Sequence, residues 1–340
     1  MRKHRVLLLV HEGLVPKEGI PIAEVEPAWR MEWDVVTTLR ERGHELKVIG
    51  VHDDLTPIRS SIEEFKPDIV FNLLEAFDNI CVFDQNVVSY LELLKIPYTG
   101  CNPRGLTLAR DKALARKLLA YHRIPSPAFK VIPFGKKPVL PRKLGFPLIV
   151  KSLTYEGSAS ISQASVVANQ EQLEKRVKFI HATLYTPAIV EQFINGRELY
   201  VGVLGNHRLR VFPVWEMSFT NMPADNWRIA TERVKWNAAY QKKHGIETGE
   251  AKLEDDVAVK IKQLAARAFR ALELSGYARF DFRMDETGNP YVIEANPNPQ
   301  LAKVEDFAQS AIRSRMNYSR LLGRIMALGL EWQPHRMEID

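Results

Sequence analysis

The chain has 340 residues, of which 46% are hydrophobic and 26% charged, and its net charge is +6. These proportions are typical of a folded globular protein, and the length suffices for two to three domains. Lysine and arginine are spread along the chain without an aromatic-interleaved basic stripe, which argues against a nucleic-acid partner.

Three further observations bear on localisation. No run approaches the roughly 18 apolar residues of a membrane span. The apolar run in the opening MRKHRVLLLV is five residues long, too short for a signal peptide. The two cysteines, Cys81 and Cys101, have neither metal nor redox spacing. We therefore expect a cytoplasmic protein without a membrane partner.

The first hundred residues alternate between strand and helix patterns. Strands are predicted at 5–10, 45–51 and 68–73, and helices at 29–42, 58–65 and 87–94. This alternation predicts a parallel sheet of the Rossmann-like kind. The first strand ends in HEG instead of a glycine-rich dinucleotide fingerprint. Ligands gather at the carboxyl ends of such strands, so Glu12, and Asn72 with Glu75, are candidate contacts for an amine or hydroxyl. Each of them alone also fits a solvated loop residue.

The rest of the chain continues with mixed elements. We predict a helix at 108–122, a strand at 146–152 and a further strand at 161–167. Strand patterns then follow within 188–205 and at 208–216, and a helix at 256–274 precedes a β-hairpin over 277–296. The segment 220–255 has no clear pattern.

The hairpin places two acids opposite each other. In YARFDFRM, residues 277–284, one face is apolar and the other carries Arg279, Asp281 and Arg283. The turn DETGN returns the chain into YVIEAN, so Asp281 comes opposite Glu294, with Cβ atoms about 5 Å apart. Opposed carboxylates repel each other unless a positive group lies between them.

A divalent metal is the simplest such group. Carboxylate and amide oxygens without histidine or cysteine suit Mg²⁺ or Mn²⁺, and Asn296 follows Glu294 on the same face. Two prolines then end the strand. The alternative is a solvated sheet face on which Asp281 and Glu294 pair with Arg279 and Arg283.

Upstream polar residues suit a nucleotide. Lys151 ends an apolar strand, and the hydroxyl-rich loop that follows contains Ser158, which together suit phosphate oxygens. An ordinary hairpin loop with a surface lysine fits the same letters. In VEQFINGREL, an apolar linker separates Glu191 from Glu198, which would suit adenine followed by ribose. Lys112 lies on a helix with a like-charged neighbour, Arg116, four residues on.

Taken in order, these elements resemble the ATP-grasp superfamily, and within it the D-alanine:D-alanine ligase group. The resemblance implies an α/β and α+β fold of three lobes, with a Rossmann-like domain at 1–105, a central lobe at 106–187 and a C-terminal lobe at 188–340. It further implies that Lys112, Lys151 and Ser158 hold the phosphates of ATP, and that Glu191, Phe193 and Ile194 meet adenine while Glu198 meets ribose. Mg²⁺ or Mn²⁺ would lie on Asp281, Glu294 and Asn296, Arg279 would stabilise transition-state charge, and Glu12 would receive the first substrate's amine.

The sequence departs from that group on the substrate side. The group ends its metal motif with E-x-N-T-x-P-G, whereas this chain has EANPNPQLA, with Gln300 in place of the glycine. We therefore predict an ATP-dependent carboxylate–amine ligase that acts on an amino acid or small peptide through an acyl phosphate. The alternatives are a D-alanine:D-alanine ligase proper and a catalytically silent ATP-binding module. A homodimer is compatible with either.

Overall fold

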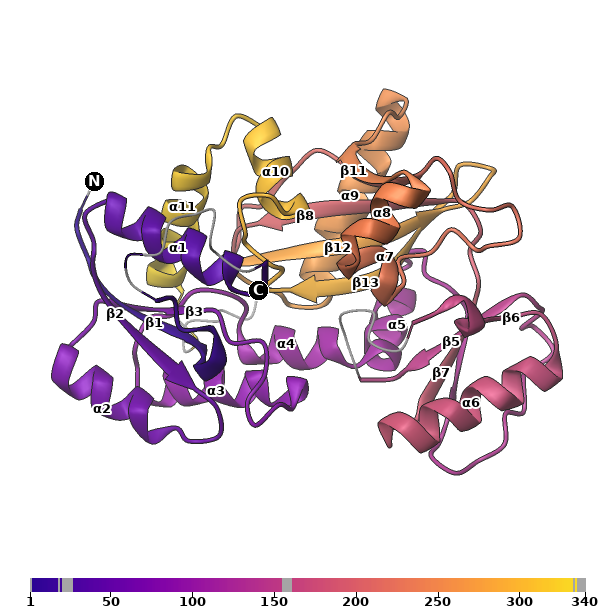
Figure 1. Cartoon of the computed structure of the whole chain (residues 1–340), viewed down its shortest axis with the longest axis horizontal. Helices are drawn as coiled ribbons and strands as arrows, with labels where there is room; N and C mark the ends of the chain where they lie inside the picture. The colour runs from indigo at the N-terminus through magenta and orange to yellow at the C-terminus, as the bar shows by residue number, and fades with distance from the viewer. Residues whose placement is uncertain (1, 18, 20–26, 155–160, 333, 335–340) are drawn as a thin grey trace.

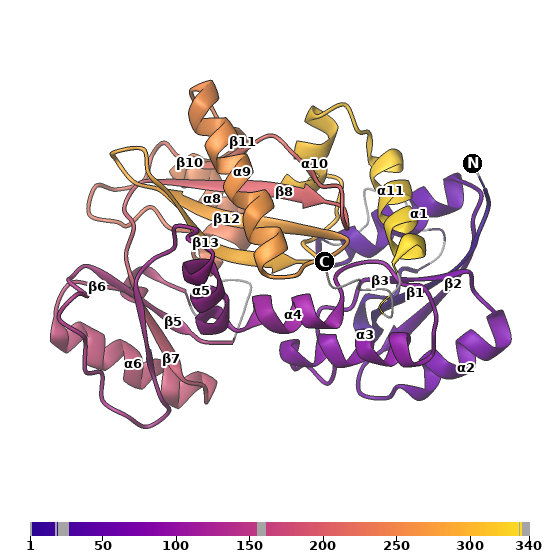
Figure 2. The same ribbon diagram turned by 180° about the vertical axis from the view of Figure 1, so that it is seen from behind.

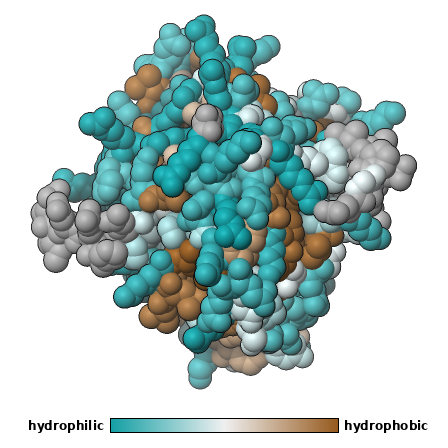
Figure 3. All heavy atoms as spheres, turned by 90° about the vertical axis from the view of Figure 1, so that its left-hand side faces the viewer, coloured by the Kyte–Doolittle hydropathy of each residue, from teal (hydrophilic) through white to brown (hydrophobic). Residues whose placement is uncertain are grey.

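The computed structural model describes residues 2–17, 19, 27–154, 161–332 and 334. It has three sheets in three lobes along its longest axis (Figure 1). Among the described residues, no helix is long and apolar enough to cross a membrane. Seen from the side of the N-terminal lobe, the surface is mainly hydrophilic, with hydrophobic side chains in small groups (Figure 3).

The N-terminal lobe has a parallel sheet of order β2-β1-β3, as the alternating pattern predicted. The apolar residues of β1 and β3 are buried because helices cover both faces, whereas the edge strand β2 is mostly half-buried. The strands are β1 (Arg5–His11), β2 (Glu45–Val51) and β3 (Ile69–Asn72), and the helices are α1 (Arg30–Glu41), α2 (Thr56–Phe65) and α3 (Asp84–Leu93). The last helix, α11 (Tyr318–Glu331), returns to pack against β3 and α1.

The central lobe has an antiparallel sheet of order β4-β7-β5-β6, covered by one helix. The strands are β4 (Phe129–Ile132), β5 (Leu148–Ser152), β6 (Val166–Val167) and β7 (Ala188–Gln192), and the helix is α6 (Gln170–Leu184). Its small core is separate and includes Leu148, Val150, Val177 and Val190. Two helices, α4 (Pro103–Arg110) and α5 (Lys112–Tyr121), connect this lobe to the first (Figure 2).

The C-terminal lobe has the longest strands, in the order β11-β10-β8-β12-β13, with β9 beside β8. They are β8 (Arg197–Leu204), β9 (Arg210–Val211), β10 (Trp215–Phe219), β11 (Ile246–Glu250), β12 (Tyr277–Met284) and β13 (Pro290–Pro297). Helix α9 (Asp255–Ala271) covers one face, and α7 (Glu232–Trp236) and α8 (Ala238–His244) lie over the other (Figures 1 and 2). Helix α10 (Asp306–Arg313) contacts β8 and β11.

The apolar face of β12 explains which side of the sheet is left for polar groups. Ala278, Phe280 and Phe282 are fully buried and share a core with Leu264 and Phe269 of α9. Because side chains alternate along a strand, the odd-numbered polar residues of β12 face away from α9. They point to the side on which α7 and the central lobe lie.

Three predicted elements were wrong in detail. The helix expected at 108–122 is two helices, because the Asp111 side chain accepts a hydrogen bond from Leu114 N and starts a new helix. The strand expected at 161–167 is reduced to β6, because Ser162 and Ser165 form a capping box around a short 3-10 helix, Gln163–Ser165. The strand expected at 208–216 is divided at Pro213, which has no N–H for a sheet.

Candidate active site

The hairpin β12–β13 has the predicted register. Asp281 pairs directly with Glu294, and Arg279 pairs with Asn296 two residues further along. Since paired residues and their i+2 neighbours share a face, these four polar side chains form one block. A bulge follows Asp281, so the register shifts only beyond the block. Gly288 in the turn has φ +81°, the left-handed conformation expected of it.

Protein cations accompany both acids of this block. Arg279 donates from Nε and Nη2 to the Asp281 carboxylate, at 2.8 and 3.1 Å. Lys112 Nζ lies 3.5 Å from Glu294 Oε1. Pairing with arginine is thus present at Asp281, but Arg283 contacts neither acid, and the face is largely buried instead of solvated.

A second charged cluster lies beside the block. Glu191 on β7 has no exposed surface and accepts from Arg116 Nε at 2.7 Å, while Lys151 Nζ of β5 is 3.0 Å away. Burial alone raises the pKa of Glu191, but the attraction of Arg116 and Lys151 outweighs this effect and lowers that pKa to about 2. Glu191 is therefore a fixed anion.

Helix α5 joins the two clusters. Its first residue, Lys112, is turned to Glu294, and Arg116, one turn on, is turned to Glu191 and to the carbonyl oxygen of Ile293. Burial lowers the pKa of Lys112, and Glu294 partly offsets this effect. From the sequence alone, Arg116 was predicted only to repel Lys112 four residues away on the same helix. In the structure Arg116 pairs with the buried Glu191 and Lys112 with the partly exposed Glu294, and no pattern local to the helix signals these partners.

Residues of both clusters line one cleft between the central and C-terminal lobes, among them Asp281, Glu294, Lys151 and Glu191. The cleft and its open mouth together hold about 620 Å³ of empty space, part of which is open to solvent. Its apolar walls include Ile149, Ile161, Phe193 and Ile229. Its polar lining includes Lys151, Glu191, Glu198, Asp281 and Glu294. An apolar slot with a charged end suits a nucleotide.

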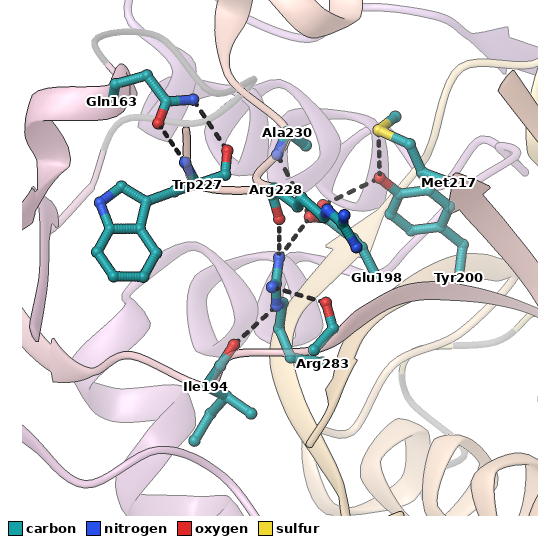
Figure 4. A network of polar contacts seen from close by, with 10 residues as sticks. Gln163, Ile194, Glu198, Tyr200, Met217, Trp227, Arg228, Ala230 and Arg283 are labelled. Atoms are coloured by element: carbon teal, nitrogen blue, oxygen red, sulfur yellow. Dashed lines mark hydrogen bonds and ion pairs between the residues drawn. The ribbon is translucent and has the colours of Figure 1, made fainter. Parts of the chain in front are cut away.

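Glu198 closes the apolar end of the cleft through a dense network (Figure 4). Its carboxylate accepts hydrogen bonds from Tyr200 Oη at 3.0 Å, Arg283 Nη1 at 3.0 Å and Ala230 N at 3.3 Å. Phe193 and Ile194 lie in the linker between β7 and β8, and both are buried. Strand β8 thus places Glu198 directly beside this linker.

Lys112, Arg279 and Asn296 do not line the cleft themselves but lie beside Glu294 and Asp281, whereas Glu12 lies elsewhere. Glu12 follows β1 at the edge of the N-terminal sheet, is exposed, and lies 2.9 Å from His52 Nδ1. Ser158 is outside the described residues. Conversely, the sequence did not single out Lys235 of α7, which lines the cleft and helps to lower the pKa of Glu294. Thr231, whose side chain caps α7, was the local signal for that helix.

The comparisons with known proteins identify the family. A family model described as D-ala D-ala ligase C-terminus matches residues 123–327. The chain belongs to this family. It is 31% identical over 291 residues to the D-alanine–D-alanine ligase of Desulfotalea psychrophila, covering 84% of this chain and 86% of that protein. It is 30% identical over 325 residues to the uncharacterized protein y4sG of Sinorhizobium fredii, covering 92% of each.

Solved structures agree with the fold. The D-alanine–D-alanine ligase of Bacillus anthracis complexed with ATP has a TM-score of 0.73 at 20% identity, covering 96% of this chain and 98% of that one. The D-Ala:D-Ser ligase VanG of Enterococcus faecalis has a TM-score of 0.69 at 17% identity, covering 96% and 100%. The predicted ATP-grasp fold is confirmed, and this D-alanine–D-alanine ligase family member is an ATP-dependent ligase that forms carbon–nitrogen bonds.

Proposed function

We propose that this ligase joins the carboxylate of an amino acid or small peptide to an amine, and that D-alanyl-D-alanine is at most a weak product. The observation that carries the proposal is the cleft lined by Lys151 and by the paired carboxylates of Asp281 and Glu294, which are themselves contacted by Arg279 and Lys112. Such an arrangement places positive charge where phosphates and a developing oxyanion need it.

The residues present fit a divalent metal. Asp281, Glu294 and Asn296 supply hard oxygen ligands on one face, and the Asn296 side chain has no hydrogen bond with any described residue. When bound, Mg²⁺ or Mn²⁺ would neutralise phosphate charge at this block. Lys112 and Arg279 balance the two carboxylates in the structure, and this balance keeps the site assembled without added ions.

Each remaining residue has a role that its position supports. Lys112 and Lys151 lie at the charged end of the cleft and would bind the phosphates of ATP. The substrate carboxylate would take the γ-phosphoryl group of ATP and release ADP. The amine would then attack this acyl phosphate, so that a C–N bond forms, the C–O bond to phosphate breaks, and phosphate and the amine proton leave. Arg279 would stabilise the oxyanion of that step, and Glu12 would receive the amino group of the first substrate.

The proposed substrate specificity is argued from the loop that follows β13. Asn298 has a left-handed backbone with φ +55°, and its Oδ1 accepts a hydrogen bond from Cys101 N at 2.7 Å. Further on, Lys303 N donates to Asp34 Oδ2 at 2.8 Å. The altered NPNPQLA segment is therefore tied to the N-terminal lobe at both ends. A fixed loop with Gln300 in place of glycine supports a pocket of different shape from that of a D-alanine:D-alanine ligase.

The test is phosphate release with Mg-ATP across pairs of D- and L-amino acids and short peptides, with products identified by mass. We expect release with a pair other than two D-alanines. Efficient D-alanyl-D-alanine synthesis, with kcat/KM near about 10⁴ M⁻¹s⁻¹, would overturn the specificity and leave the ligase chemistry standing. A parallel melting experiment measures the nucleotide. Mg-ATP at about 100 times its Kd should stabilise the protein by roughly 2.7 kcal/mol, and NAD by much less.

A further inference from the structure

One segment of the C-terminal lobe is fastened to the central lobe by a single side chain. The Gln163 side-chain amide donates from Nε2 to Trp227 O at 2.9 Å, and its Oε1 accepts from Trp227 N at 2.8 Å (Figure 4). Both backbone polar groups of Trp227 are thus paired by one side-chain amide, as a neighbouring strand would pair them. Gln163 lies in a short 3-10 helix that belongs to the other lobe.

Arg283 also holds the segment that contains Trp227 and Arg228. Its guanidinium donates to three carbonyl oxygens: Ile194 at 2.9 Å, Gly196 at 3.0 Å and Arg228 at 2.8 Å. It also donates to Glu198 at 3.0 Å, and its side chain is buried. The planar, multiply donating guanidinium suits this geometry, which a lysine ammonium could not reproduce. Arg283 therefore fixes the linker between the lobes and the segment after Trp227 relative to each other.

The segment held between these two anchors forms a wall of the cleft. Ile229 is 4% exposed, lines the cleft, and packs with Phe193 and Val166. Trp227 lies edge-on to Phe193 with ring centroids 5.0 Å apart. The residues that close the apolar slot thus come from two lobes, and their spacing depends on the anchors.

We propose that Gln163 and Arg283 are positioning residues that hold the wall 227–230 of the apolar slot in which the purine base of ATP would lie. The proposal rests on the proposed function, in which this cleft binds ATP. Neither residue supplies charge to the phosphates, because the cations at that end are Lys112, Lys151 and Lys235. Loss of either anchor should therefore weaken base recognition and leave the phosphate end assembled.

The test compares variants of the full chain by calorimetric titration with Mg-ATP and Mg-GTP. Gln163→Met introduces a side chain of similar size and removes both hydrogen bonds to Trp227. Arg283→Met removes four hydrogen bonds. We expect the Kd for Mg-ATP to rise about tenfold in Gln163→Met and further in Arg283→Met. The ratio of the GTP and ATP dissociation constants should fall in both, and KM for ATP should rise more than kcat falls.

Two matched controls separate positioning from general damage. Gln170→Met removes a surface glutamine of the same lobe that contacts Glu174 and Pro138. Arg197→Met removes an arginine of the same sheet that pairs with Glu216 and the Lys252 carbonyl. Both should keep the wild-type Kd and base selectivity.

The outcomes distinguish the two proposals. If wild-type protein binds Mg-ATP and Gln163→Met binds it equally well with unchanged base selectivity, the positioning role is overturned while the function stands. If the wild type does not bind Mg-ATP, both fail. Should Arg283→Met not fold, Gln163→Met decides alone, because its partly exposed side chain contributes little to the core.

Discussion

Predicted site residues lie in two regions that are built differently. The first is the floor of the cleft, formed by Glu191, Arg116 and Lys151, and the second is the edge of the N-terminal sheet at the carboxyl ends of its strands, where Glu12 follows β1. On the floor, Glu191 has no exposed surface and is held by Arg116 and Lys151. At the edge, the Glu12 side chain is 60% exposed and its partner within the described part of the chain is His52, which is itself partly exposed. The acid of the first region is buried in ion pairs, and the acid of the second is largely exposed.

This difference follows from the cost of burying charge. An unpaired ion inside a protein costs several kcal/mol, so the cleft must satisfy its own charges before any nucleotide arrives. An exposed pair contributes little to stability, so the residues at the edge can vary without unfolding the chain. We infer that the nucleotide end is constrained by folding as well as by chemistry, whereas the substrate end is constrained by chemistry alone.

Replacing the buried acid Glu191 should have the largest effect, which is a loss of folding stability. Glu191→Gln leaves Arg116 and Lys151 without their anion, and we expect it to lower the free energy of unfolding by about 3 to 5 kcal/mol. Chemical denaturation without nucleotide measures this loss. Glu216→Gln is the control, because its pair with Arg197 is partly exposed and should contribute less than about 1 kcal/mol. Equal losses in the two variants would contradict the comparison.

Glu191 should also make the free energy of unfolding depend on pH in the acid range. The pKa of Glu191 is about 2 in the folded protein against an ordinary value of 4.5, so its stabilising contribution is complete above pH 4.5. As the pH falls from 4.5 towards 2, the unfolded state takes up a proton first and the contribution is lost. The wild type should therefore lose more stability over this range than Glu191→Gln.

A change in the metal block should affect activity more than folding. Glu294→Gln removes one of the two carboxylates of the block that Asp281, Glu294 and Asn296 form. We expect turnover to fall by at least about 10². Melting without ATP should barely change, because the Glu294 side chain is 28% exposed and its cation is 3.5 Å away. If the variant unfolds and the surviving molecules keep full activity, the block is a structural ion-pair cluster and not a metal site.

The smallest effect is expected at the edge. Glu12→Gln should lower kcat/KM for the amino-acid substrate by about tenfold, which corresponds to one charged hydrogen bond. The Kd for Mg-ATP and the melting temperature should stay at wild-type values, as expected for an exposed side chain outside the cleft. A matching loss of ATP affinity would show that the two regions are coupled.

Local patterns predicted the hairpin and its pairing of Asp281 with Glu294. Alternation fixes which residues share a face, and a tight turn fixes the register, so both are readable within twenty residues. The same reasoning was wrong at 208–216, where Pro213 interrupts the strand, and at 108–122, where Asp111 caps a second helix. In each case a single capping or breaking residue outweighed the longer hydrophobic pattern.

By itself the sequence determined many of the helices and strands and the facing pair Asp281 and Glu294, because period, turn and strand-end signals are local. Only the tertiary structure decided the partners of the charges. Arg116 meets Glu191 across 75 positions, and Gln163 meets Trp227 across 64. Such pairs form because chain folding brings distant groups into the same dry space, where each must find a partner, and no local pattern records which one it will be.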